Sequence, residues 1–364
     1  MISTARKGQL GRLGQFWVVI AVLAMGCLAA PVRAEIQNDA VGFSTNHVFE
    51  SSQAGEHIDT MTGNMTLTIP IGPRYKLHDG FSYGVTLYYN AKIWDHECPE
   101  NAGENTPCPG DIIAPDTYGL GFSIWPARVY HKERDKEWVY RVVLEDGSEH
   151  MFCETDYYDE SCDVGFTQDA ARMRVEKITT AGDAFLGWDV YPNDGRKLIL
   201  RQRVNVADPE SKDALVTRIE SVERIPNLSV PQDQWEAAQW VDYNYQGTGS
   251  WALSSITDSQ QRTIEFVDTA NGREIRFPKF SAEEDPVPSA KAVYTLHRAA
   301  LTVYDPADGV TGSYVPSPMV LDSISYPPEL PNVEPYRFAY TRGTAPARGW
   351  MLQRTIPTGA VPCG

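Results

Sequence analysis

The sequence predicts an all-β fold built from antiparallel hairpins. Apolar and polar residues alternate along runs such as 65–69 and 83–89, and this period of two gives a strand one apolar face and one wetter face. Asp-Gly and Asn-Gly pairs recur between such runs, and they favour tight chain reversals because they accept positive φ. Aromatic residues make up 11% of the 364 residues, which also suits sheets.

Residues 58–90 show this pattern most clearly. Met65, Leu67 and Ile69 alternate with threonines, Pro70 is expected to end or interrupt that strand, and Asp79-Gly80 turns the chain into the next run. A single pair of strands is not stable in water. We therefore expect this hairpin to belong to a larger sheet.

The first 34 residues have the composition of a secretory signal peptide. A basic start (Arg6, Lys7, Arg12) precedes an uncharged apolar run, and small residues lead to a cleavage site between Ala34 and Glu35. The apolar run is roughly 15 residues long, shorter than the ~20 that a spanning helix needs, so cleavage is favoured over an uncleaved membrane anchor. Cys27 raises a lipoprotein alternative, but the residues before it match that signal poorly.

The mature chain is strongly acidic. Residues 1–34 hold four of the 32 basic residues and no acidic one, so 28 basic and 48 acidic residues remain and the mature net charge is −20. This charge argues against nucleic acid and anionic membrane surfaces as partners. We expect an exported protein that is periplasmic, on the cell surface or extracellular, without stable membrane insertion after cleavage.

Five of the six cysteines follow the signal peptide. Cys98 lies close to Cys108 in sequence, and Cys153 lies close to Cys162. In an exported chain each close pair predicts a local disulfide that closes a loop. Cys363 is left over.

Beyond the signal peptide, residues 35–57 read as a flexible lead-in, and residues 58–364 as one β-hairpin repeat domain. Loops are expected at 92–115, 156–163 and 281–290, and only residues 232–239 carry a short helical pattern. The expected strands span residues 118–125, 138–144, 150–153, 173–178, 188–191, 197–202, 215–222, 240–245, 253–256, 263–267, 274–280, 294–304, 320–326 and 336–340.

A degenerate unit recurs along the chain. A Leu, an Ile three positions on, a turn and a strand with an aromatic residue appear around 251–266, again around 320–340, and begin once more at 350–359. Repeats of this kind bury a core by stacking on their neighbours.

These units resemble the YD-repeat, or Rhs-repeat, family of bacterial exported proteins, in the part that precedes the main repeat array. The resemblance covers most of residues 55–360 and rests on residues 59–64, 88–90, 119–123, Asp146-Gly147-Ser148, 253–258 and 356–359. It implies an extended, curved sheet like the start of a hollow β shell, which in this family often encloses a toxin or carries other modules.

The sequence departs from the family pattern at residues 357–364, where a Tyr-rich returning strand would follow. We therefore expect the repeat domain to be incomplete at its C-terminus, as a truncated frame, a standalone amino-terminal module or one half of a split pair. A downstream YD-repeat chain or segment is the candidate partner. By this interpretation the chain is a non-enzymatic structural module of a cell-surface or toxin-delivery assembly.

The sequence carries none of the common catalytic motifs. No metalloprotease, nucleophile-elbow or phosphate-loop motif is present, and no cofactor or metal site is predicted. His96 near the cysteines reads as an exposed residue of a disulfide loop, and the acidic run 156–163 lacks the spacing of a calcium loop.

The alternative function is an extracellular carbohydrate-binding protein or glycoside hydrolase on a β scaffold. Trp94, Trp125, Trp138 and Trp251 could stack on sugar rings, although aromatic residues of a sheet protein mostly pack its interior. With 48 acidic residues no particular carboxylate pair can be chosen for hydrolysis.

Overall fold

The computed structural model divides the chain into two units, Met1–Asp39 and Ala40–Gly364. The predicted signal peptide, with Ala34 and Glu35, lies outside the described residues. No helix in the described part is long and apolar enough to cross a membrane. The structure describes residues 43–44, 49–51, 56–59, 64–78, 81–91, 94–96, 110–112, 118–119, 121–124, 126–134, 137–156, 164–202, 212–226, 229, 231, 236–246, 252–270, 272–280, 286–300, 303–304, 314–315, 319–330, 333–340 and 352–355.

Every regular element in the described residues is a β-strand, which confirms the predicted all-β class. In the described residues the strands pair antiparallel, apart from a short parallel contact between Phe43–Ser44 (β1) and the start of β11. One smaller sheet has the order β2-β3-β4-β5-β8. Its strands are β2 (Phe49–Ser51), β3 (Glu56–Asp59), β4 (Met65–His78), β5 (Phe81–Asn90) and β8 (Phe122–Ser123).

The main sheet holds 17 strands. Besides β1 they are β9 (Ala127–Arg134), β10 (Glu137–Leu144), β11 (Ser148–Asp156), β12 (Val164–Phe166), β13 (Arg174–Thr179), β14 (Phe185–Tyr191), β15 (Arg196–Gln202), β16 (Ala214–Ser221), β17 (Trp240–Tyr245), β18 (Leu253–Asp258), β19 (Thr263–Thr269), β20 (Gly272–Phe280), β21 (Pro286–Ala300), β24 (Met319–Ser325), β25 (Tyr336–Tyr340) and β26 (Leu352–Thr355).

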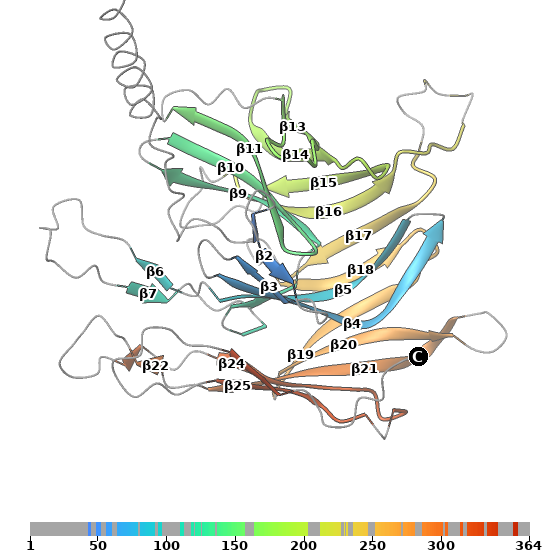
Figure 1. Ribbon diagram of the computed structural model, residues 1–364. Helices are drawn as coiled ribbons and strands as arrows, with labels where there is room; N and C mark the ends of the chain where they lie inside the picture. The colour runs from blue at the N-terminus through green and yellow to red at the C-terminus, as the bar shows by residue number, and fades with distance from the viewer. Residues whose placement is uncertain are drawn as a thin grey trace, which may run out of the picture. The chain divides into compact units, whose positions relative to one another are not determined.

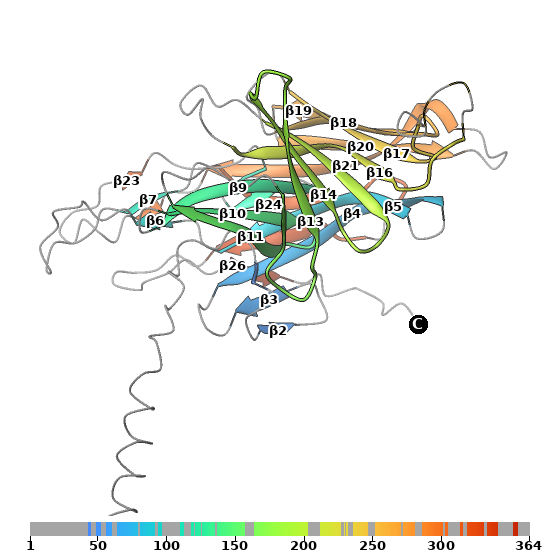
Figure 2. The same ribbon diagram turned by 90° about the horizontal axis from the view of Figure 1, so that it is seen from above.

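Strands of the main sheet pair mostly with the next strand along the chain. From β12 to β21 each strand is antiparallel to its successor, and the series continues through β24, β25 and β26 (Figure 1). Strands β9, β10 and β11 form a second run of neighbours (Figure 2). The two runs meet at β16, where Ala214 and Leu215 pair with β9 while residues 218–220 pair with β17.

Period-two patterning decides which face of each strand is buried. Along β5, Phe81, Tyr83, Val85 and Leu87 are buried and the residues between them up to Thr86 are half-buried. Leu87 is fully buried, which stabilises the fold by roughly 1.5–3 kcal/mol relative to an exposed leucine.

The apolar faces of the two sheets pack against each other. In Figure 1, β4 and β5 lie in front of β17–β20. Phe277 of β20 reaches the backbone of Gly72 in β4, the Tyr75 hydroxyl donates to the Pro278 carbonyl, and the Tyr83 hydroxyl donates to Asp258. A single cluster of buried residues therefore draws on both sheets.

The Asp146-Gly147 turn forms as predicted. Gly147 has φ of 81° and its N–H donates to the Leu144 carbonyl, so it closes the β10–β11 hairpin. A Cβ at this position would lie 2.2 Å from a ring carbon of Tyr88. Both the positive φ and the close approach of Tyr88 therefore require glycine.

Several boundaries differ from the sequence prediction. The expected lead-in contains β1, β2 and part of β3. These strands are two to four residues long, which is too short for a period-two signal. β4 continues through Pro70, which is exposed. β3 pairs with β4 only at residues 65–67, so the missing N–H of Pro70 costs no hydrogen bond to β3.

Two expected loops also differ, as does the short helical pattern at 232–239, of which residues 232–235 lie outside the described residues. The loop at 92–115 contains β6 (Trp94–His96) paired with β7 (Gly110–Ile112), and β21 begins at Pro286, inside the loop expected at 281–290. A further pair joins β22 (Val303–Tyr304) to β23 (Tyr314–Val315). Residues 236–239 are not helical: Ala237 forms a bridge with Arg224, because pairing with a neighbouring segment outweighs a short helical pattern.

Candidate functional site

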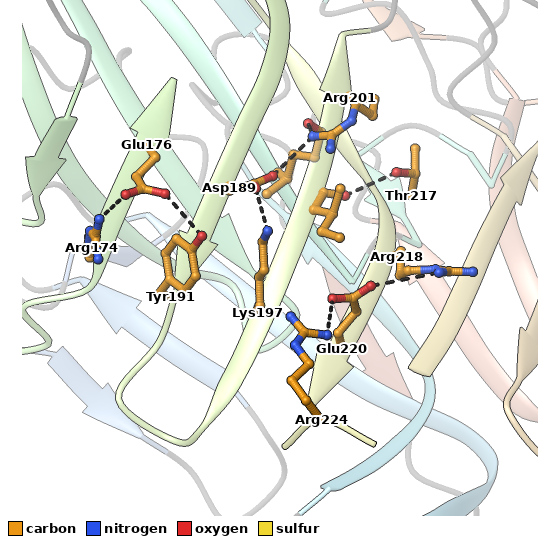
Figure 3. A network of polar contacts seen from close by, with 12 residues as sticks. Arg174, Glu176, Asp189, Tyr191, Lys197, Arg201, Thr217, Arg218, Glu220 and Arg224 are labelled. Atoms are coloured by element: carbon orange, nitrogen blue, oxygen red, sulfur yellow. Dashed lines mark hydrogen bonds and ion pairs between the residues drawn. The ribbon is translucent and has the colours of Figure 1, made fainter. Parts of the chain in front are cut away.

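Charged side chains of β13–β16 form a network of polar contacts (Figure 3), which Arg218 extends to Asp242 of β17. They occupy alternate positions whose neighbours, such as Val190, Leu198 and Ile219, are buried in the core. Alternation therefore places the charges on the face opposite the core, which we call the outer face.

Asp189 of β14 is the first centre of this surface. Its Oδ2 lies 2.6 Å from Lys197 Nζ and its Oδ1 accepts from Arg201 Nη1 at 3.1 Å, both from β15. Burial lowers the pKa of Lys197, but the hydrogen bond and charge of Asp189 outweigh it, so the pKa lies above its ordinary value.

Glu176 of β13 links the neighbouring groups. It is ion-paired to Arg174, and its Oε2 accepts from the Tyr191 hydroxyl at 3.0 Å. Burial is the main reason that the pKa of Tyr191 is raised. Glu176 and Asp189 are directly opposite in the β13–β14 register. The cations bound to them and the Tyr191 hydroxyl therefore offset the repulsion between the two carboxylates.

Arg218 of β16 is the second centre. Its Nε and Nη2 donate to the two oxygens of Asp242 at 2.5 and 2.9 Å, a bidentate geometry. These hydrogen bonds raise the pKa of Arg218 above its ordinary value. Glu220 lies 3.7 Å from Arg218 and accepts from Arg224 at 2.9 Å.

An open groove runs over β15, β16 and β17 beside this second centre. It has a volume of about 530 Å³, and its lining includes Ile199, Thr217, Arg218, Glu220, Asp242 and Asn244. The groove thus combines a guanidinium, two carboxylates, an amide and a hydroxyl with an apolar side chain. Such groups can bind a polar ligand through several hydrogen bonds at once.

A second polar cluster is buried at the start of β11. Ser148 Oγ lies 2.8 Å from His150 Nε2, and His150 Nδ1 contacts Asp169 Oδ2. All three residues are buried, with exposed fractions of 4%, 4% and 7%. The order serine, histidine, aspartate has the connectivity of a hydrolase triad.

The surroundings of this cluster favour a structural role. Ser148 Oγ also lies 2.7 Å from Asp146 Oδ1, which accepts the Ser148 backbone N–H as well. A hydroxyl has one proton, so Asp146 competes with His150 for it. The cluster joins the β10–β11 turn to Asp169, which precedes β13, and it is too buried to meet a substrate.

Most of the site residues predicted from the sequence lie outside the described residues. Cys98, Cys108 and Cys162 lie outside the described residues, as do Trp125 and Trp251, and the side chains of Trp94 and Trp138 are not described. Cys153 is half-buried in β11 and is disulfide-bonded. Its pairing with Cys162 stays a prediction, as does the Cys98–Cys108 bridge.

The groove and the buried cluster were missed by sequence reasoning. Arg218 and Asp242 are 24 positions apart and meet only through the register of β16 with β17. Ser148 and His150 lie two positions apart on one strand, a spacing that local reasoning could have noticed, but Asp169 follows 19 positions after His150. Across the described ranges, no group of three or more His, Cys, Asp and Glu is placed to hold a metal ion.

Comparisons with known proteins do not assign a family. No protein-family model and no curated protein matches the sequence. The crystal structure of TcdB2-TccC3-TEV matches with a TM-score of 0.29 and 10% identity over 87% of this chain and 20% of that one. The crystal structure of TcdB2-TccC3 matches with a TM-score of 0.31 and 9% identity over 86% and 20%. The chain spans about a fifth of these structures, and TM-scores this low carry no conclusion about its fold or function.

Proposed function

We propose that this chain is an exported, non-enzymatic structural module in which successive β-hairpins build part of a wall. The observation that carries the proposal is the unbroken antiparallel order from β12 to β21, in which each strand pairs with its successor. Each strand of such a series hydrogen-bonds to its neighbours along the chain, so a further hairpin can extend the series by the same pairing.

The two faces of the main sheet support this role. One face packs on the smaller sheet through apolar residues, while the outer face carries cross-strand ion pairs such as Arg218–Asp242 and Lys291–Glu265. Paired charges keep a broad sheet soluble and discourage unplanned association of its surface.

The resemblance to the start of a YD-repeat shell is part of the same proposal. Two of the segments that carry it have the roles expected of repeat units. Asp146-Gly147 forms a tight turn, and in β18 Leu253 and Ile256 are buried while Asp258 begins the turn to β19. These roles support the family interpretation without depending on the structural matches.

The partner we propose is a chain or segment that continues the hairpin series. β25 pairs with β26 through four residue pairs, including Ala339 opposite Gln353. A further strand could add beside such a hairpin by main-chain hydrogen bonds, which need little side-chain complementarity.

A photoreactive amino acid at Gln353 tests this function in the exporting cells. We expect it to cross-link to a polypeptide that carries Tyr-Asp-type hairpin repeats, whereas the same probe at Glu265, on the outer face of β19, does not. Cross-links from both positions to unrelated proteins, or a folded chain that forms none from Gln353, would contradict the proposal.

The rival function, glycoside hydrolysis, receives less support from the described groups. Glu220 and Asp242 are the two carboxylates of the groove, and both are ion-paired to Arg218. A retaining or inverting hydrolase needs one carboxyl group that stays protonated until it donates to the leaving group. In this groove both carboxylates instead contact the same Arg218 guanidinium.

A further inference from the structure

We propose that the groove over β15, β16 and β17 binds a neutral polysaccharide. The proposal goes beyond the structural role, because it assigns a ligand to a surface that hairpin pairing does not use. It rests on the volume of the groove, the chemistry of its lining and the balance of its charges.

The dimensions of the groove suit a small segment of an extended chain. Its volume of about 530 Å³ falls within the range of ligand sites, roughly 300–1,000 Å³. It opens on the outer face, so a long polymer can pass over it and need not enter by an end. A small buried ligand would instead need an enclosed cavity.

The polar groups of the lining match the hydroxyl groups of a sugar. Asp242 and Glu220 accept hydrogen bonds, Arg218 donates them, and Asn244 offers both functions. Asn244 is exposed, and its Nδ2 donates to Ser255 Oγ at 3.1 Å, which orients the amide. Adjacent hydroxyl groups of one sugar ring can thus be bound as donor and acceptor together.

The charges of the groove favour a neutral ligand. Arg218 is held by both oxygens of Asp242, and Arg224 balances Glu220, so the charged groups already offset one another. An anionic ligand would meet two carboxylates, and a cationic ligand would have to displace an arginine. Neutral hydroxyl groups can bond to the remaining lone pairs and N–H groups without breaking an ion pair.

Apolar surface is present beside these polar groups. Ile199 lines the groove from β15, and Trp240 lies directly opposite Glu220 in the β16–β17 register. The Arg218 guanidinium lies 4.8 Å from the centre of the Trp240 ring, so the ring also fixes the position of the arginine. The C–H faces of sugar rings pack on such surfaces.

Affinity electrophoresis of the mature protein tests the proposal. Native gels would contain dextran, laminarin, xylan or galactomannan as neutral polymers, or polygalacturonate as an anionic one. We expect at least one neutral polymer to retard the protein, and we expect the Asn244→Ala and Asp242→Asn variants to bind that polymer at least tenfold more weakly.

Glu265→Gln is the matched control, since it removes an ion-paired carboxylate from the same outer face outside the groove. This variant should be retarded like the unmodified protein. Thermal unfolding of each variant checks the fold, and exposed Asn244 provides a variant that leaves the Arg218–Asp242 pair intact. Retardation by polygalacturonate alone, by none of the neutral polymers, or equally in all variants would overturn the proposal, whatever the cross-linking at Gln353 shows.

Discussion

The Tyr83 hydroxyl donates a 2.9 Å hydrogen bond to Oδ2 of Asp258, 175 positions further along the chain. Tyr83 belongs to β5 of the smaller sheet, and Asp258 ends β18 of the main sheet. Asp258 is fully buried, and it also accepts from Arg262 Nε at 2.6 Å and from the backbone N–H groups of Gln260 and Arg262. One carboxylate therefore closes a turn and ties the two sheets together.

Replacing Tyr83 with Phe should lower the free energy of unfolding by about 1–2 kcal/mol, because a buried carboxylate loses one of its donors. Urea unfolding should show a lower midpoint with an unchanged slope. Tyr191→Phe is the matched control, since its acceptor Glu176 lies on the outer face, and it should cost less. Equal losses in both variants would argue against a cross-sheet role for Tyr83.

Alkaline pH should destabilise the fold through its buried tyrosines. Burial raises the pKa of Tyr75 to about 12 and that of Tyr89 to about 12, whereas an unfolded tyrosine titrates near 10. The folded chain keeps these protons when the unfolded chain releases them. Stability is thus fully present below pH ~10 and is lost as pH rises towards about 12.

Urea midpoints measured across this pH window check the effect. Between pH ~10 and about 12, the free energy of unfolding should fall less for the Tyr89→Phe variant than for the unmodified protein. The variant has one fewer tyrosine with a raised pKa. A midpoint that does not change with pH in this window would contradict the burial of these hydroxyl groups.

The strands and turns were the predictable part of this fold. Alternation in β5 and the Asp146-Gly147 turn are encoded within a few residues, so local patterns are sufficient to find them. The pairing of β6 with β7 was missed because each strand is only three residues long, too short for a period-two pattern. Pro70 does not end β4 as expected, because a missing N–H weakens a strand only at an edge where a neighbouring strand would accept it.

The candidate groove could not be predicted from local patterns. Arg218 and Asp242 look like any charged residues of a half-exposed strand, and 22% of the chain is charged. Only the register between β16 and β17 turns them into a bidentate pair. The Tyr83–Asp258 bond depends in the same way on how the two sheets pack.

Gly147→Ala should destabilise the protein by about 2–4 kcal/mol, because an L-residue is strained at a φ of 81° and its Cβ would collide with Tyr88. Thermal unfolding measures the loss. Gly182→Ala is the control: nothing closer than 3.9 Å surrounds a Cβ there, and its effect should stay within about 0.5 kcal/mol. Comparable effects at both glycines would show that the turn does not need positive φ.

We expect protein recovered outside the cytoplasm to contain disulfides at Cys98–Cys108 and Cys153–Cys162. Titration of the unfolded, unreduced protein with a thiol reagent should then detect only Cys363. Protein retained in the cytoplasm by deletion of residues 1–34 should expose the other four thiols as well. Four additional reactive thiols in the exported form would exclude both bridges.

Hydrogen exchange during stepwise denaturation tests most directly whether successive hairpins form one continuous sheet. We expect the backbone amides of β13–β21 to lose protection together, in one cooperative transition, because each strand shares its hydrogen bonds with the next. Separate transitions that divide these strands into independently unfolding lobes would contradict the continuous wall proposed for this protein.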